Sequence, residues 1–166
     1  MRAFAVLVLA LLTGLATAES IKIGYLNIGA VVNNLTQYRH GNERIADKFD
    51  PRKKELLNLF KHIELLKENL SNKSSQITTK AYENEIKHIN ILEVNFQKDT
   101  ELWQFQLNQE KQLLLQQVES LINQAVEMFA KDGLYDLILY DNVAFANDKI
   151  DDISYDVINL IEASSP

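Results

Sequence analysis

The feature that most constrains this chain is a heptad repeat that fills its middle. In the first part of the repeat, apolar residues recur three and four positions apart, the spacing of a coiled-coil seam: Leu56, Leu59, Ile63, Leu66 and Leu70. A polar cluster at residues 71–75 then interrupts the pattern. It resumes in steps of seven through Tyr82, Ile89, Phe96 and Trp103 and, after one step of four, through Leu107, Leu114, Leu121 and Met128. Two such segments joined by a short polar turn predict an antiparallel helical hairpin with its tip at about residues 71–78.

The length and charge of the two segments favour this pairing. A helix over residues 78–130 would be roughly 80 Å long at ~1.5 Å per residue, so the hairpin must project from a smaller body. Residues 52–80 hold seven basic and three acidic side chains, whereas residues 81–130 hold three basic and eight acidic ones. Opposite charge on facing helices favours the antiparallel partner over self-pairing. Glu93 and Thr100 occupy the second seam position in the middle, where we expect poor packing or contact with water.

The chain ahead of the repeat predicts a strand and a short helix. Residues 21–28 form an almost continuous apolar run, as in a buried strand. Asn27 is placed to cap a helix that carries Ile28, Val31, Val32 and Leu35 at helical spacing. Gly41 predicts an interruption before the hairpin. Asp50 and Pro51 predict either a new helix start or a kink in a continuous helix, and the sequence leaves both alternatives open.

The chain after the repeat returns to β structure. Gly133 ends the long helix, and residues 134–140 predict a second strand. Residues 141–142 form a turn pair, and residues 143–146 predict a short third strand. Residues 151–154 offer caps for a final helix with one apolar stripe: Ile153, Val157, Leu160 and Ile161.

These elements together predict a mostly α protein with a small β body. Strands come from both ends of the chain, so the ends must meet to form the body. We assign residues 19–41 and 132–166 to the body and residues 42–131 to the hairpin arm. Three strands make a marginal sheet, so we expect the body to assemble with copies of itself. The expected contacts between copies are apolar strand residues: Ile21, Ile23, Tyr25, Leu137, Leu139, Val143 and Phe145.

The first eighteen residues predict a cleavable signal peptide. Arg2 precedes an apolar run over residues 3–12, and Ala16 and Ala18 fit the small-x-small cleavage rule. The alternatives are an uncleaved anchor and a buried helix. We expect cleavage after Ala18 and therefore export, which suits a chain that has no cysteine.

Composition and motifs exclude several function classes. The net charge of −6 argues against nucleic-acid binding, and 5 Gly with 2 Pro argue against an all-β fold. The sequence has no phosphate-binding loop and no thiolate nucleophile, so we expect neither catalysis nor a cofactor. Glu85 and His88 match half of a di-iron motif, but no second pair accompanies them, so we expect no metal.

Four segments carry a resemblance to a known family. They are IKIGYLNIG at residues 21–29, FDPR at 49–52, LILYDNVAFA at 137–146 and DISYDV at 152–157. From residue 21 to about 161 the chain resembles the Skp/OmpH family of periplasmic chaperones of Gram-negative bacteria. The resemblance implies a homotrimer with three helical arms that project from a β-containing trimerisation body.

The resemblance also implies an activity. Family members hold unfolded outer-membrane β-barrel proteins in the cavity between the arms without ATP, and pass them towards the outer-membrane assembly machinery. Trp103 lies on the seam, where core packing is expected, whereas Phe105 lies off it and suits an exposed contact. The candidate client contacts on the arm are Lys61, Lys67, Lys73, Lys80, Phe96 and Phe105.

The chain departs from the family in its net charge, and its arms also allow a second function. Well-known family members are strongly basic, whereas this chain is acidic, so lipopolysaccharide binding does not carry over on charge alone. Anionic lipid and the assembly machinery are the further partners that the resemblance suggests. The alternative is a structural or adaptor coiled-coil protein of the cell envelope that has the same arms but does not bind unfolded chains.

Overall fold

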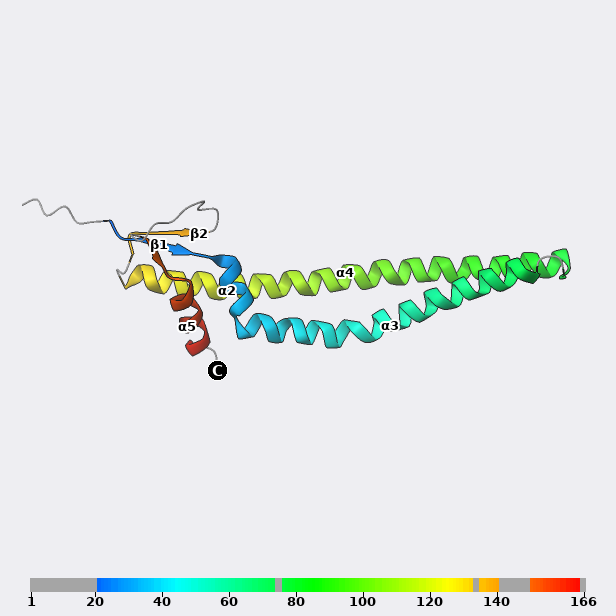
Figure 1. The fold of residues 1–166 in the computed structure, drawn as a ribbon, viewed down its shortest axis with the longest axis horizontal. Coiled ribbons are helices and arrows are strands. Elements are labelled where there is room, and N and C mark those ends of the chain that lie inside the picture. The colour runs from blue at the N-terminus through cyan, green and yellow to red at the C-terminus, as the bar shows by residue number, and fades with distance from the viewer. Residues whose placement is uncertain (1–20, 74–75, 133–134, 141–149, 165–166) are drawn as a thin grey trace, which may run out of the picture.

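A long helical hairpin and a small β body make up the computed structural model, which describes residues 21–73, 76–132, 135–140 and 150–164. In chain order the elements are β1 (Ile23–Leu26), α2 (Ile28–Asn34), α3 (Thr36–Lys73), α4 (Thr79–Lys131), β2 (Leu137–Tyr140), β3 (Asp151–Asp152) and α5 (Ser154–Ser164). The hairpin projects from the body (Figure 1), so the predicted fold class is confirmed. Among the described helices, none is both long and apolar enough to cross a bilayer. The predicted signal peptide lies outside the described residues.

The two long helices meet along the predicted seam. α3 and α4 run antiparallel and come together again towards the tip (Figure 1). Leu56 and Ile63 of α3 are buried, and so is Ile89 of α4. α4 has 53 residues, which corresponds to roughly 80 Å at ~1.5 Å per residue. The heptad pattern therefore identified the contact face of the arm correctly.

The predicted interruption at Gly41 is wrong. The break between α2 and α3 lies at Leu35, which has an extended backbone conformation with φ −71° and ψ 128°. α3 then continues through Gly41 without a break. Gly41 is buried, and a Cβ atom built on it would lie 2.3 Å from Cδ1 of Leu114 in α4. The glycine therefore allows two helices to approach closely, a role that depends on a partner 73 residues away (114 − 41).

Of the two alternatives at residues 50–51, the continuous helix is the one observed. Pro51 lies inside α3, which changes direction part-way along its length (Figure 1). Proline has no backbone N–H, so the carbonyl of residue 47 loses its partner within the helix. Proline is the usual cause of such a bend.

The sheet joins the two ends of the chain, as predicted. Its strand order is β2–β1–β3, and β1 pairs with both neighbours in parallel. Ile23 is opposite Leu137, and Gly24 is opposite Asp151. The whole hairpin thus lies in the crossover between β1 and β2. The third strand observed is β3, whereas the predicted strand at residues 143–146 lies outside the described residues.

Side-chain caps connect the sheet to the short helices. The side chain of Asn27 accepts a hydrogen bond from the backbone N–H of Ala30 at 2.8 Å, which confirms the predicted N-cap of α2. The backbone N–H of Asn27 donates to Oγ of Ser154 at 2.9 Å, and the N–H of Ser154 donates to the carboxylate of Asp152 at 3.0 Å. These bonds fix the starts of α2 and α5 beside each other.

The main core lies where the body meets the base of the hairpin. Its fully buried members come from β1, α2, α4, α5 and the loops beside them: Leu26, Val31, Leu35, Val118, Ile122, Ile153, Val157 and Ile161. The predicted apolar stripe of the last helix is confirmed, since Ile153, Val157 and Ile161 are buried and Leu160 packs against them.

The seam prediction is wrong for Met128 at the body end of α4. Met128 is 49% exposed, whereas Ile122 and Val126 are buried. α4 contacts α5 in this region as well as the start of α3. Its buried face therefore widens to serve a globular core, because Ile122 and Val126 are buried in addition to Val118 and Ala125, which are seven residues apart.

Candidate functional site

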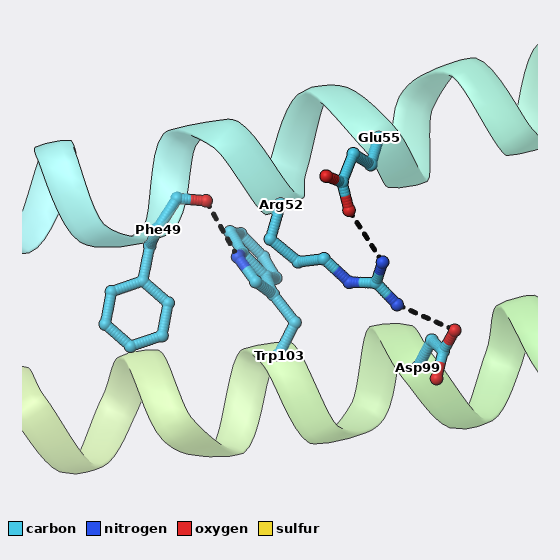
Figure 2. Close-up of polar contacts among 5 residues, drawn as sticks. All are labelled: Phe49, Arg52, Glu55, Asp99 and Trp103. Atoms are coloured by element: carbon cyan, nitrogen blue, oxygen red, sulfur yellow. Dashed lines mark hydrogen bonds and ion pairs between the residues drawn. The ribbon is translucent and has the colours of Figure 1, made fainter.

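The arm has a distinct junction at the bend in α3. Trp103 of α4 donates from Nε1 to the backbone carbonyl of Phe49 at 3.2 Å (Figure 2). Trp103 is partly buried against the core cluster, as its seam position predicts. Its indole thus bridges the two helices within the turn at residues 47–51 whose backbone pattern Pro51 disturbs.

Arg52 forms a second bridge at the same place. Its guanidinium contacts Glu55 on its own helix at 2.7 Å and Asp99 on α4 at 2.8 Å (Figure 2). The hydrogen bond to Glu55, together with the contacts to Asp99, raises the pKa of Arg52 above its ordinary value. The side chain is therefore held as a cation between two carboxylates.

Further ion pairs join the helices towards the body and towards the tip. Lys48 pairs with Glu110 near the body. Lys67 pairs with Glu93 at 2.6 Å and with Glu64 at 2.9 Å. Hydrogen bonds to these two carboxylates raise the pKa of Lys67 above its ordinary value, and the bond to Glu93 has the larger effect. Each pair between the helices joins a base on α3 to an acid on α4, which confirms the pairing predicted from charge.

The middle of the seam is polar, as predicted. Glu93 is half-buried and faces Lys67 across the hairpin. Oγ1 of Thr100 is buried and has no hydrogen-bond partner within the described part of the chain. The two helices are therefore held here by peripheral ion pairs and aromatic contacts rather than by a continuous apolar seam.

A groove opens on the arm beside the bend. Its volume is about 630 Å³, and Phe49, Arg52, Trp103, Gln106 and Leu113 contribute to its lining. Its charged residues are those already engaged in the ion pairs between the helices. Across the described ranges, no three His, Asp or Glu side chains are grouped as a metal site would require. The groove suits the docking of side chains better than acid–base chemistry.

The predicted client contacts do not form one patch. Lys61, Lys67 and Lys73 lie on α3, whereas Lys80, Phe96 and Phe105 lie on α4. Phe96 is half-buried, and its ring centroid is 5.8 Å from that of Phe60 across the hairpin. Phe105 is 59% exposed and, nine residues along the same helix, points to the opposite side. The lysines are exposed, and Lys67 is the one held by two carboxylates.

Sequence reasoning missed most of the exposed apolar residues of the arm. Large apolar side chains are more than half exposed at Leu57, Leu65, Ile91, Val94, Leu102 and Leu113. They lie off the heptad seam, and this position is the signal that could have identified them. An apolar residue on a coiled-coil helix but off its seam is left largely uncovered by the other helix.

The predicted contacts of the body lie on and beside the sheet. Ile21 is 73% exposed and Leu137 is 47% exposed, whereas Ile23, Tyr25 and Leu139 are half-buried. Val143 and Phe145 lie outside the described residues. Tyr140 is also exposed, and it lines an apolar groove of about 400 Å³ with residues of α2 and α4. The role of these residues in assembly stays a prediction.

A family model and a solved structure that resemble this chain carry the same family description. A family model described as outer membrane protein (OmpH-like) matches residues 22–161. The crystal structure of a protein from Caulobacter crescentus CB15, described as a candidate outer membrane chaperone (OmpH-like), has a similar fold. Its TM-score is 0.71 at 16% sequence identity, over 88% of this chain and 86% of that one. Among curated proteins, none matches this chain.

Proposed function

The chain belongs to the family of OmpH-like outer membrane proteins, and we propose from that premise that it is an ATP-independent holdase chaperone of the periplasm. In this proposal the arm holds unfolded outer-membrane β-barrel proteins and prevents their aggregation. The protein catalyses no reaction and needs no cofactor. The leader at residues 1–18 directs export and is cut after Ala18.

The observation that carries this proposal is the exposed apolar surface of the arm. The hairpin buries its own seam at positions such as Leu56, Ile63 and Ile89, yet both helices also expose large apolar side chains away from that seam. Such residues bury much less surface within the hairpin than the seam residues do. Apolar surface of this kind is typical of a binding surface.

The chemistry of the client fits this surface. An unfolded barrel strand alternates apolar and polar side chains and exposes unpaired backbone groups. No single deep pocket can hold such a chain, but many weak contacts along a rod can do so. Their combined affinity greatly exceeds that of any one contact.

A homotrimer would enclose a client between three arms. The body has only three described strands, and Ile21 and Leu137 beside and on its sheet are exposed. A small sheet with exposed apolar residues gains stability when it associates with copies of itself. We propose that residues 19–41 and 132–166 form this shared body and that residues 42–131 form the arm.

Light scattering tests the proposal directly. The mature chain is measured alone and with a barrel protein that is diluted out of urea. A trimer that keeps the barrel protein soluble as a defined complex is the expected result. A monomeric mass at micromolar concentration would contradict the proposed assembly. A trimer that lets the barrel protein precipitate would favour the structural or adaptor role in the cell envelope.

A further inference from the structure

One face of α4 carries an ordered row of exposed apolar side chains. Ile91, Val94, Leu102 and Phe105 are 53–64% exposed. Ile91 and Leu102 are eleven residues apart, as are Val94 and Phe105. Eleven residues are close to three full turns, so each pair lies on nearly the same line along the helix. This row points away from α3, because the buried seam residue Ile89 and the half-buried Trp103 lie on the opposite face.

Three lysines share this face. Lys87 lies seven residues after Lys80, and Lys98 lies eleven residues after Lys87, so all three fall on the line of the apolar row. All three are exposed, and within the described part of the chain none of them is within ion-pair distance of a carboxylate. We call the seven residues Lys80, Lys87, Ile91, Val94, Lys98, Leu102 and Phe105 the α4 stripe.

The acids of α4 lie off the stripe. Residues 81–130 hold eight acids against three lysines, yet the stripe itself has no carboxylate. Glu93, Asp99 and Glu110 are paired with bases of α3. Glu83 and Glu101 lie at the edge of the stripe, where Glu101 accepts a hydrogen bond from Gln97 at 3.0 Å. An acidic helix therefore presents a basic and apolar face.

The outward face of α3 lacks this separation of charge. Leu57 and Leu65 are exposed there, but Asp50 and Glu68 share their side of the helix with Lys61. Acids and bases alternate on this face, so it has little net charge. The contrast between the two helices singles out α4.

We propose that the α4 stripe is the surface on which the arm receives its clients, and that it prefers extended segments in which carboxylates lie among apolar side chains. This inference rests on the function proposed above. The lysine ammonium groups attract the carboxylates, while the lysine stems and the apolar row cover the apolar side chains. From Lys80 to Phe105 the stripe measures roughly 38 Å, which about eleven or twelve residues of extended chain would span.

The stripe leads into the groove beside the bend of α3. Leu113, which lines that groove, lies eleven residues after Leu102 and is 54% exposed. Gln109 also lines the groove and lies one turn after Phe105. A chain bound along the stripe could therefore place a large side chain into the groove next to Trp103. This continuity extends the proposed surface towards the body.

Paired peptides test the preference for charge. The probe is a fluorescent unstructured peptide in which leucine and glutamate alternate, and its twin has glutamine in place of glutamate. Fluorescence anisotropy should show the glutamate peptide binding roughly five- to tenfold more tightly than its twin, since three weak exposed ion pairs add to the apolar contacts. The triple variant Lys80→Gln, Lys87→Gln and Lys98→Gln should bind both peptides about equally.

A matched triple variant on α3 controls for net charge. Arg39→Gln, Lys53→Gln and Lys54→Gln remove the same charge from exposed positions outside the stripe. This variant should keep the preference of the parent protein, and circular dichroism should show unchanged helix content in both variants. The preference should also weaken with added salt, because exposed charges are screened.

A second pair of variants tests the apolar row. Leu102→Ser with Phe105→Ser should weaken binding of both peptides and reduce protection of a barrel protein diluted from urea. Leu57→Ser with Leu65→Ser removes exposed apolar surface from α3 and should reduce binding and protection clearly less than the α4 pair does.

The possible outcomes separate this inference from the proposed function. If the parent protein fails to protect the barrel protein, the holdase function is wrong. If it protects but the α4 and α3 variants behave alike, the holdase stands and the α4 stripe is not its surface. Equal binding of both peptides by the parent protein overturns the charge preference. If the triple α4 variant loses binding to phosphatidylglycerol vesicles but not to the peptides, the lysines serve a lipid surface and the client assignment is wrong.

Discussion

The substitution Gly41→Ala tests a close contact between the two long helices. A Cβ atom at this position would lie 2.3 Å from Cδ1, 2.8 Å from Cδ2 and 3.1 Å from Cγ of Leu114. Leu114 is only 7% exposed and is part of the core cluster, so its side chain has little room to turn aside. Either the leucine or the helix must move to accept the methyl group.

The net effect is the sum of two opposing contributions. Alanine favours the helix by about 1 kcal/mol over glycine in a helix interior. Forcing a methyl group into a packed contact costs about 1–3 kcal/mol. We therefore expect Gly41→Ala to lower the free energy of unfolding by up to about 2 kcal/mol. In a Leu114→Ala background the clash is absent, so the same substitution should raise this free energy by about 1 kcal/mol.

The assay is urea unfolding followed by circular dichroism at one fixed protomer concentration, because assembly affects apparent stability. Four proteins complete a double-mutant cycle: the parent, the two single variants and the double variant. Leu114→Ala alone should cost about 2–5 kcal/mol. Gly29→Ala is the matched control, since a Cβ atom there meets its nearest neighbour, Oδ1 of Asn27, at an ordinary 3.5 Å.

The sign of the change in unfolding free energy in the two backgrounds tests whether Gly41 packs against Leu114. Packing against Leu114 requires that Gly41→Ala destabilises the parent protein and stabilises the Leu114→Ala variant. Equal effects in both backgrounds would refute the argument, because they would show that the two residues do not interact. A stabilised parent would show that helix propensity alone governs this position.

Three further substitutions test the arm. Ile63→Asp places a carboxylate at a seam position that is 2% exposed, so the arm should lose at least about 3 kcal/mol of stability. The variant should protect barrel proteins less while the oligomer persists. Loss of the oligomer, seen by light scattering, would mean that Ile63 lies in the assembly interface. Trp103→Phe removes the hydrogen bond to the Phe49 carbonyl and should cost about 0.5–1.5 kcal/mol in urea unfolding, and an unchanged midpoint would count against the bridge. Lys67→Glu should lower the thermal midpoint by roughly 1–2 °C, and adding Glu93→Lys should restore it in low salt; failure of this rescue would show that the pair contributes nothing measurable.

Local pattern was sufficient for much of this fold. Leu56 and Ile63 on α3 are seven residues apart, and Ile89 belongs to the separate heptad series on α4, so the buried face follows from the sequence alone. Asn27 caps α2 through a side chain and an N–H only three residues apart. Interactions between residues within one or two helical turns of each other can be inferred directly from their spacing in the sequence.

The candidate site was predicted less well for the same reason. The sequence identified Phe105 as exposed, but it could not tell which lysines are engaged by acids on the other helix. Lys67 looked equivalent to its neighbours until the register of the hairpin brought Glu93 beside it. The spacing of seven and eleven residues that places Lys87 and Lys98 on one face was present in the sequence throughout, although only the orientation of the seam shows which way that face points.

The sequence by itself determined a heptad hairpin, strands from both ends of the chain and the caps that start the short helices, since each depends on neighbouring residues. Only the tertiary structure decided that Gly41 is a contact and not a break, that Pro51 bends α3 without ending it, and that Met128 faces solvent while Ile122 is buried. Each of these depends on a surface contributed from far along the chain. The free energy of such packing depends on residues of another helix or strand, and the local sequence around one residue does not show which residues those are.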